Sequence, residues 1–404
     1  MKNPAIAEGI GFINYAWPEL GLRVLVERIK DEGSAELRFY SVKDKEESLL
    51  HITRVNLMST GTMNSLAKRL EKNSEDIPWT DILTYITGKT MEIARRGEPA
   101  EEIWPSEDDD LAPSYLLEPI LYLNHPAVIF GDYSSLKSLV ALVIGYIVQL
   151  PYRDNALGFT TGKESTLCLY LDWEDDPSSF RKRWSALDRG LGEGATPILY
   201  RRMTGTLSDS VEQLQRIIHA GNIGLIIADS LGPAARGNLN DPEPAIRYHA
   251  ALRQLGVTSL TLAHTAKDQF TKRRSIFGSV FFTNLARSVW ECKAEQETGE
   301  DEAVISLKHT KANLSRLHPP LGYRFTFGVN TIAVAKADLK DTGLSGELPL
   351  TFRIKDLLRG GAMTVKAIAE VLEANEASAR TIINRMAKKD QLVKVGEAWG
   401  LPAL

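Results

Sequence analysis

Residues whose types suit phosphate binding lie between Gly131 and Ser138, directly after the apolar run Ala127–Phe130. Their spacing follows the phosphate-binding pattern G-x-x-x-x-G-K-S/T, except that Leu136 stands in place of the second glycine. In such a loop, backbone N–H groups and the positive end of the following helix face phosphate oxygens. The lysine, here Lys137, reaches the β- and γ-phosphates, and the hydroxyl holds Mg²⁺. The run therefore predicts a site for ATP and Mg²⁺ at a strand-to-helix turn.

Leu136 is the main departure from that pattern. Glycine suits a position where the backbone approaches a ligand or takes a positive φ, and leucine is strained there if φ is positive. Two outcomes follow: weak but real ATP turnover, or a nucleotide site that keeps only a structural role. The presence of Lys137, Ser138 and the polar residues described next favours turnover.

Three further apolar runs follow along the chain, and each ends in polar residues. They are the run 166–171 with Glu174 beyond it, the run 223–228 with Asp229, and the run 258–263 with His264. Strands that alternate with helical patterns indicate a parallel sheet, and ligands bind beyond the carboxyl ends of such strands. We therefore expect an α/β fold that gathers these side chains around one nucleotide. The residues expected to contact it are Gly131, Asp132, Tyr133, Ser134, Ser135, Leu136, Lys137, Ser138 and Asp229, with Ser138 and Asp229 also serving Mg²⁺.

In combination, these motifs resemble those of a RecA-like ATPase over residues 115 to about 330, roughly half of the chain. The most similar proteins are the hexameric RepA-type replicative helicases and their phage and mobile-element relatives of the AAA family. The matching residues are the P-loop 131–138, Leu171–Glu174, Leu225–Ser230, Ala263–His264, Phe277–Ser279, Asn284–Arg287 and Lys311–Asn313. The array is specific in combination, although no single motif is.

The resemblance implies roles for the strand-end residues. Glu174 would orient and polarise the attacking water, because phosphoryl transfer depends mainly on positioning and electrostatics. Asp229 would position Mg²⁺ through water, and His264 would sense the γ-phosphate. Taken singly, Asp229 is as readily a strand-end cap and His264 a core histidine. By strand alternation Asp172 should point the same way as Glu174, whereas the neighbouring acids at 175 and 176 are expected to be solvated.

The resemblance also implies a contribution from a neighbouring subunit. Arg287 is the candidate arginine finger, and Lys311, with Arg316 as a second choice, would supply further positive charge in trans. The alternatives are that Arg287 forms a salt bridge within its own domain and that Lys311 belongs, with Lys308, to a solvated strand face.

Two basic segments are candidates for DNA binding. Lys272, Arg273 and Arg274 follow the His264 strand, as the DNA-gripping loops of RecA-like motors do, and Lys or Arg contacts to phosphates give sequence-independent binding. Phe270 could stack on a base there. An ordinary exposed turn is the alternative.

The second basic segment lies near the C-terminus, where a helix, a helix-turn-helix pattern and two strand-like runs resemble a winged helix. Its presumed recognition helix could enter the major groove. A protein-binding role or a plain solvated face is the alternative. The basic residues of this helix are Arg380, Arg385, Lys388 and Lys389.

The chain divides into five segments by composition and pattern. They are a small N-terminal α+β domain of unassigned role with three strand-like runs (1–96), an acidic, proline-containing linker (97–114), the RecA-like domain with a mostly parallel central sheet (115–337), a second linker (338–349) and the winged helix-turn-helix domain (350–404).

The composition is that of an ordinary globular protein. The chain has 404 residues, of which 43% are hydrophobic and 25% charged, and a net charge of −4. Because the net charge is slightly negative, DNA affinity must come from local patches. Cys168 and Cys292 lie in apolar contexts, which predicts reduced thiols and a cytoplasmic location. The apolar run Leu139–Val148 is too short to span a bilayer, and the N-terminus lacks the pattern of a secretion signal.

These features predict an ATP-hydrolysing motor that remodels DNA, namely a hexameric replicative-type helicase of a plasmid, phage or mobile element. A recombination or loading ATPase of the same fold, assembled as filaments, is the first alternative. A DNA-binding regulator that senses nucleotide and hydrolyses it weakly is the second, and it depends on Leu136 and the winged helix.

Overall fold

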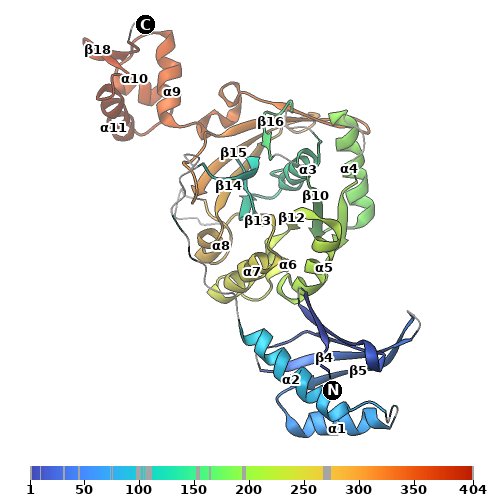
Figure 1. The fold of residues 1–404 in the computed structure, drawn as a ribbon. Helices are drawn as coiled ribbons and strands as arrows, with labels where there is room; N and C mark the ends of the chain where they lie inside the picture. Colours follow the sequence, from blue (N-terminus) through green and yellow to red (C-terminus); the bar gives the residue numbers. More distant parts are fainter. Residues whose placement is uncertain are drawn as a thin grey trace. The chain divides into compact units, whose positions relative to one another are not determined.

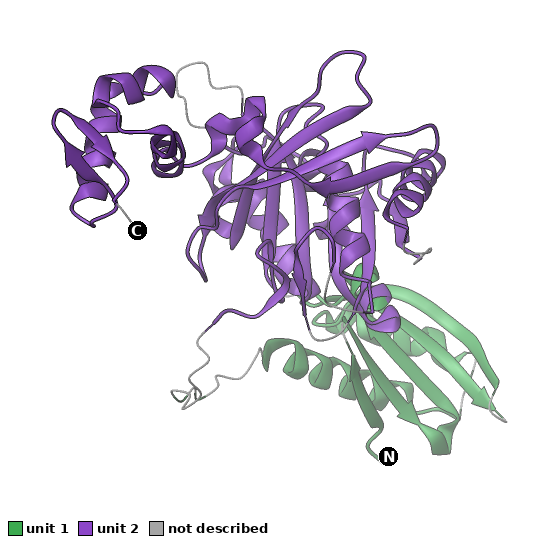
Figure 2. Cartoon of the chain, turned by 90° about the horizontal axis from the view of Figure 1, so that it is seen from above, with its two compact units in different colours: residues 1–111, 212–216 green, residues 112–211, 217–404 purple. Residues whose placement is uncertain are grey.

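The computed structural model describes residues 2–9, 11–30, 32–43, 46–72, 74, 76–96, 102, 104, 112–151, 155–162, 165–192, 197–266 and 274–402. The chain forms two compact units, one of residues 1–111 with 212–216 and one of residues 112–211 with 217–404 (Figure 2).

The N-terminal unit is an antiparallel sheet covered by two helices. The strands follow in sequence order: β1 (Ala5–Gly9), β2 (Phe12–Trp17), β3 (Leu22–Glu27), β4 (Ser34–Lys43) and β5 (Glu46–Asn56). Alternate side chains such as Tyr15, Val24 and Phe39 are buried, as the period-2 geometry of a half-buried sheet requires. Helices α1 (Thr60–Glu71) and α2 (Trp79–Arg96) share this core.

A nine-stranded sheet forms the centre of the second unit (Figure 1). Its order is β11 (Leu199–Arg202), β10 (Leu167–Asp172), β12 (Ile223–Asp229), β13 (Thr258–His264), β8 (Pro126–Gly131), β14 (Ser288–Glu295), β15 (Glu302–Ala312), β16 (Leu321–Phe327) and β17 (Ile332–Lys336). The strands from β11 to β14 are parallel, and the remaining pairs are antiparallel. The predicted α/β fold with a mostly parallel, RecA-like sheet is therefore confirmed. One strand, β13, separates the P-loop strand β8 from the Asp229 strand β12.

Helices cover both faces of this sheet. On one face lie α3 (Lys137–Ile147) and α4 (Pro177–Leu191). The apolar residues of α3 pack on strand residues that share one face, among them Ile129, Ile227 and Leu262. The opposite face carries α6 (Leu231–Ala235) and α7 (Pro242–Leu255). Each large side chain buried in this way contributes about 1.5–3 kcal/mol, so α3 is fixed firmly behind the P-loop.

Shorter elements complete the unit. They are a small sheet of β6 (Tyr115–Glu118), β7 (Leu121–Tyr122) and β9 (Thr160–Thr161), with helices α5 (Val211–Gly221) and α8 (Val280–Leu285). The segment 339–347 consists of two short 3₁₀ turns. No helix in the described ranges is long and apolar enough to cross a membrane.

Three helices and a hairpin end the chain: α9 (Leu350–Leu357), α10 (Val365–Val371), α11 (Glu376–Ala387), β18 (Val393–Val395) and β19 (Ala398–Gly400). Ile354, Ile368 and Ile383 form their common core. Thr364 caps α10 by accepting a hydrogen bond from Ala367 N, a role for which threonine is well suited.

Candidate functional site

The register of the parallel strands brings the predicted strand ends to one edge of the sheet. Asp172 pairs with Asp229 between β10 and β12, and His264 pairs with Gly131 between β13 and β8. Between β12 and β13, Asp229 pairs with Leu262, so β13 and β8 extend two residues beyond the ends of β10 and β12. All four strands end at one edge of the sheet, and the P-loop leaves the sheet from the same edge.

The P-loop has the strained backbone that the missing glycine suggested. Leu136 adopts φ +59° as the N-cap of α3, and Ser134 also has φ +59°. Side chains with a Cβ rarely adopt this left-handed conformation. Gly131 is required for a different reason, because a Cβ there would lie 2.3 Å from Cys292 O.

The ammonium group of Lys137 is folded into the loop. Its Nζ donates to Gly131 O at 3.0 Å, Asp132 O at 2.7 Å and Ser135 Oγ at 3.1 Å. The side chain is buried, and burial lowers its pKa from the ordinary lysine value. The three acceptors are neutral, so phosphate oxygens would be stronger partners for this charge.

Asp229 is one of two buried acids at these strand ends, together with Asp172. Its Oδ2 accepts hydrogen bonds from Ser138 Oγ at 2.7 Å and from Tyr170 Oη at 2.6 Å. Burial raises the pKa of Asp229, while the Tyr170 and Ser138 hydrogen bonds oppose the shift. Sequence reasoning missed Tyr170, whose role depends on a cross-strand contact.

The Ser138–Asp229 pair is suited to Mg²⁺ only in part. A hydroxyl and a carboxylate are hard oxygen ligands of the kind this ion prefers. No group of three or more acidic, histidine or cysteine side chains within the described ranges could hold a metal alone. Mg²⁺ would therefore need phosphate and water oxygens beside Ser138 and Asp229, as is usual for nucleotide-bound Mg²⁺.

Glu174 lies beside the strand ends, with about half of its side chain exposed. Its Oε1 accepts a hydrogen bond from Ser230 Oγ and lies 3.9 Å from His264 Nε2. Ser230 was also missed, although it directly follows Asp229 and could have been considered for that reason. The arrangement places one carboxylate between the ends of β12 and β13.

The expected orientation of Asp172 was wrong. Strand β10 ends at this residue, so strand alternation does not extend to Glu174. Instead, Asp172 Oδ1 accepts the backbone N–H groups of Glu174 and Asp175, each at 2.9 Å. Asp172 is almost fully buried. It therefore shapes the turn that presents Glu174.

The two following acids are not simply solvated, as had been expected. Asp176 is the N-cap of α4 and accepts hydrogen bonds from Ser178 N and Ser179 N. Asp175 Oδ2 lies 2.6 Å from Arg183 Nη2. Both fix the start of α4, which leaves Glu174 as the acid of this turn that faces Ser230 and His264.

His264 is linked to the P-loop by an aromatic contact. Its ring lies 4.7 Å from that of Tyr133, with an interplanar angle of 32°. Tyr133 is otherwise largely exposed to solvent, at 73% of the residue. The backbone carbonyl of His264 also has a partner, because Phe277 N donates a hydrogen bond to His264 O at 2.8 Å.

The basic segment beyond His264 is described only in part. Lys272 and Arg273 lie outside the described residues. Arg274 is described, and its Nη1 lies 2.5 Å from Asp132 Oδ2. This candidate DNA contact therefore forms an ion pair with the P-loop.

Arg287 and Lys311 lie at the edge of the sheet opposite to the P-loop. Arg287 N donates to Pro126 O at the amino end of β8, and Lys311 pairs with Val289 at the start of β14. Strand β8 rises about 3.3 Å per residue, so roughly 16 Å separates this edge from the P-loop. Both residues are therefore too far from the P-loop of the same chain to contact a phosphate group bound there.

The ammonium group of Lys311 already has partners. Its Nζ donates to Thr283 O at 3.0 Å, Asn284 O at 2.8 Å and Ala286 O. These carbonyls belong to the C-terminal end of α8, where a cation is favourable. Burial first, and then the charge of Arg287, lower the pKa of Lys311.

Helix α11 carries the C-terminal basic residues Arg380 and Arg385, and Lys388 is its C-cap. Lys389 follows. The helix begins at Glu376, so its basic residues are accompanied by an acid. Arg380 Nη2 lies 2.7 Å from Glu376 Oε1.

One family comparison covers the strand ends. Residues 100–269 match the family model described as an AAA domain. This segment is therefore similar to an AAA domain. The match spans less than half of the chain and includes the P-loop, Glu174, Asp229 and His264. It ends before Arg287, Lys311 and the C-terminal helices.

The other comparisons are weaker. No curated protein matches the sequence significantly. A KaiC-like protein from the archaeon Pyrococcus horikoshii is 16% identical, with a TM-score of 0.37, over 58% of this chain and 99% of that protein. The flagellar accessory protein FlaH from Methanocaldococcus jannaschii is 14% identical, with a TM-score of 0.36, over 58% and 98%. The fold assignment rests on the sheet order rather than on these values.

Proposed function

We propose that the protein is an ATP-hydrolysing motor that remodels DNA, assembled as a hexamer of the replicative helicase type. The observation that supports it is the grouping of Lys137, the Ser138–Asp229 pair and Glu174 at one edge of the sheet. A cation, a hydroxyl–carboxylate pair and a separate carboxylate are the parts that phosphoryl transfer requires.

Each side chain has a distinct role in the proposed reaction. Lys137 exchanges its neutral loop acceptors for the β- and γ-phosphate oxygens. Ser138 and Asp229 hold Mg²⁺, which neutralises phosphate charge when bound. Glu174 accepts hydrogen bonds from the attacking water and orients it in line with the γ-phosphate. His264, near Glu174 and Tyr133, responds to the γ-phosphate.

An oligomer completes the proposed site. The guanidinium group of Arg287 has no hydrogen-bond or ion-pair partner among the described residues, and the residue lies far from its own P-loop. We therefore assign it to the neighbouring subunit's nucleotide. An arginine placed there stabilises the charge of the transition state. Lys311 is the weaker candidate, because leaving its three carbonyls would expose unsatisfied acceptors.

The decisive experiment is the steady-state ATPase rate with and without single-stranded DNA, measured together with oligomer mass. We expect a ring that forms with nucleotide and hydrolysis that DNA stimulates. Lys137→Ala and Glu174→Gln should each lower kcat at least a hundredfold. Glu302→Gln is the matched control for Glu174→Gln. Glu302 has a similar exposure and pairs with Arg324 on the neighbouring strand β16, which does not contribute to the strand ends at the P-loop. Normal turnover by Glu174→Gln would reject its assigned role.

The trans assignment has its own test. Arg287→Ala subunits should be inactive alone but regain part of the activity when mixed with Lys137→Ala subunits, because some interfaces then combine an intact P-loop with an intact arginine. Arg287→Ala protein that assembles and hydrolyses ATP at the normal rate would exclude the finger role. Filaments instead of rings in electron micrographs would favour the recombination or loading ATPase.

A nucleotide-sensing DNA regulator is the second candidate, and the strained Leu136 favours it. A φ of +59° at this leucine limits how readily the loop adjusts around phosphate. The regulator predicts sequence-specific duplex binding through α11 and tight ATP binding with little turnover. Salt-insensitive, sequence-independent ATPase stimulation would be inconsistent with both candidates, because phosphate contacts depend strongly on salt.

A further inference from the structure

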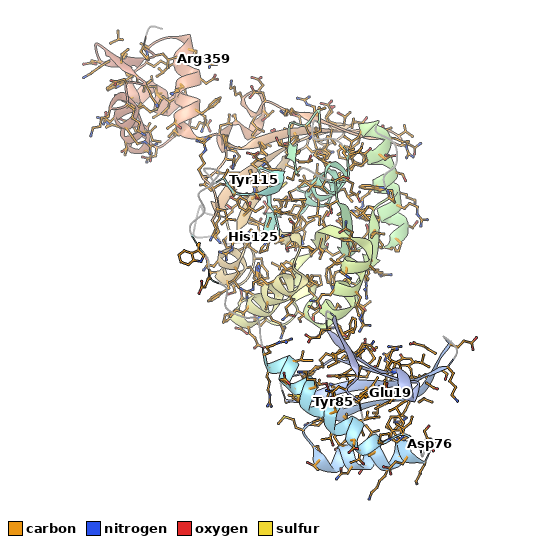
Figure 3. The ribbon with its side chains drawn as sticks, viewed as in Figure 1. Glu19, Asp76, Tyr85, Tyr115, His125 and Arg359 are labelled. Carbon is orange, nitrogen blue, oxygen red and sulfur yellow. The ribbon has the colours of Figure 1, made fainter. Side chains whose placement is uncertain are left out.

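A pocket of about 280 Å³ lies at the edge of the sheet opposite to the P-loop. It is bounded by the amino ends of β8 and β13 and by the C-terminal ends of α7 and α8. His125, labelled in Figure 3, precedes β8 and lies in its wall. The volume suits a small ion rather than a whole nucleotide.

Two buried polar groups that line the pocket have no hydrogen-bond partner. They are Ser259 Oγ and His249 Nδ1, and each residue is 2% exposed. Buried polar atoms normally have partners, and an orphan calls for an explanation such as a bound water or ligand. Two orphans in one pocket indicate a site that a polar ligand completes.

The tautomer of His249 gives the site an acceptor as well as donors. Its Nε2 lies 3.3 Å from Phe282 O, so Nε2 carries the proton and donates. Burial lowers the pKa of His249 to about 4, which keeps the ring neutral. Nδ1 is then a hydrogen-bond acceptor, whereas Ser259 can donate. A ligand with both an oxyanion and an O–H group would satisfy both atoms.

The charge around the pocket is positive. Arg253 and Arg287 line it, and neither guanidinium group has a hydrogen-bond or ion-pair partner among the described residues. The lining residues, all of them described, include no carboxylate. Burial lowers the pKa of His125, and the charge of Arg287 lowers it further. The arginine charges therefore disfavour protonation of the neighbouring histidines, and an anion would be attracted to the same positive field.

Two helix C-termini oppose this field. Such ends carry partial negative charge. However, Lys311 already binds the last carbonyls of α8, and Gly256 N donates to Arg253 O at the end of α7. The two free guanidinium groups therefore dominate the charge that a ligand would meet.

We propose that this pocket binds a phosphate oxyanion. Arg253 and Arg287 contact its charged oxygens, Ser259 donates to it, and the P–OH group donates to His249 Nδ1. The site is separate from the P-loop and works in a single chain. It does not depend on the motor function, although Arg287 is shared with the proposed trans role. Because sulfate carries no proton at neutral pH, the geometry favours phosphate over sulfate.

The test is calorimetric titration of inorganic phosphate into Lys137→Ala protein, which disables the P-loop, under conditions where light scattering shows single chains. We expect one saturable site with sulfate bound at least tenfold more weakly. A phosphate monoester, ribose 5-phosphate, is titrated in parallel. A monoester has a second pKa of about 6, so at neutral pH it has mostly lost its P–OH proton and should bind more weakly than inorganic phosphate. Equal binding of the ester would overturn the proposed hydrogen bond to His249 Nδ1.

Arg253→Gln and Ser259→Ala, each added to Lys137→Ala, locate the binding. Arg253 is exposed, so its replacement should not affect folding, and it should weaken phosphate binding at least tenfold. Arg181→Gln, an exposed change on α4, is the control and should leave binding unchanged. Ser259→Ala should remove an unpartnered hydroxyl, raise the melting temperature and reduce the shift caused by phosphate. Absence of saturable binding, or an equal loss with Arg181→Gln, would overturn the proposal.

Discussion

Arg274 Nη1 lies 2.5 Å from Asp132 Oδ2, and its Nε lies 3.8 Å from Glu291 Oε1. One guanidinium group therefore joins an exposed P-loop acid to a buried acid on β14. Within the described part of the chain, Glu291 Oε1 has no hydrogen-bond donor, and its other nearby cation is Lys293 Nζ at 3.7 Å. Arg274 thus stabilises a buried charge and holds the P-loop at the same time.

Arg274→Gln should lower stability and alter nucleotide affinity more than DNA affinity. The exposed Asp132 pair contributes about 0.2–1 kcal/mol, whereas weakening the support of Glu291 costs about 1–3 kcal/mol. Asp132→Asn is the matched variant, since it removes the exposed pair and leaves Glu291 its cation. Denaturant unfolding and the Kd for ATP and DNA distinguish the two. Equal loss in both variants would show that Glu291 does not need Arg274.

Leu136→Gly should strengthen nucleotide binding with little change in stability. Relief of the left-handed backbone is worth about 1–2 kcal/mol. Leu136 also packs partly against the main core, and losing that contact costs about 1 kcal/mol, so the two effects nearly cancel. Ser134→Gly is the control, because Ser134 has the same φ but is exposed. It should gain about 1 kcal/mol of unfolding free energy, without a comparable gain in ATP affinity.

The sequence patterns predicted the parts of the site that follow from periodicity. Apolar runs ending in Gly131, Asp229 and His264 specify strand ends, and the parallel order of the sheet brings these ends together. The AAA-domain match agrees with this reading of residues 100–269. The strain at Leu136 also followed from the type of residue at a glycine position.

Contacts across strands and turns could not be predicted in the same way. The bond from Tyr170 to Asp229 depends on the register between β10 and β12. The three carbonyls around Lys311 depend on where α8 ends relative to β15. In the N-terminal unit, both β1 and β2 were missed. Strand β1, Ala5–Gly9, is an edge strand that is mostly exposed and lacks a regular apolar pattern.

Tyr170→Phe should move the acid limb of the ATPase pH profile to higher pH. Burial raises the pKa of Asp229, and the Tyr170 hydrogen bond opposes that rise, so removing the bond raises the pKa further. The carboxylate is the form that serves Mg²⁺. As the solution is acidified, the variant should therefore begin to lose activity at a higher pH than the wild type. Tyr200→Phe is the control, since Tyr200 donates to Asp172 rather than Asp229. Coinciding profiles for wild type and Tyr170→Phe would contradict the proposed role of Asp229.

The raised pKa of Asp229 also makes the free energy of unfolding depend on pH. The dependence has the opposite sign to that of an acid whose pKa is lowered by a salt bridge. A carboxyl group whose folded pKa lies above its unfolded value binds more protons when folded, so stability increases as pH falls through that window. Tyr170→Phe should extend the window upward. Unfolding free energies measured between the ordinary aspartate pKa and neutral pH check this: the deficit of Tyr170→Phe should be larger at neutral pH than at acid pH.

Lys311→Met should reduce stability rather than transition-state stabilisation. Three carbonyl acceptors lose their donor, which costs about 1–3 kcal/mol, while the methylene groups are retained. Arg287→Gln should behave in the opposite way, with normal unfolding and reduced ATPase of the assembled protein. A large kcat effect of Lys311→Met at unchanged stability would instead assign Lys311 to catalysis.

Asp172→Asn and Asp172→Ala should separate a turn-shaping role from a direct one. Asparagine keeps an oxygen that can accept the N–H groups of Glu174 and Asp175, so the turn should persist and most of the activity should remain. Alanine leaves both donors unpaired and should lower stability by about 1–3 kcal/mol and displace Glu174, with a fall in kcat larger than any change in KM. If Asp172→Asn were as inactive as Glu174→Gln, the charge of Asp172 itself would be required and the buried acid would act in the reaction.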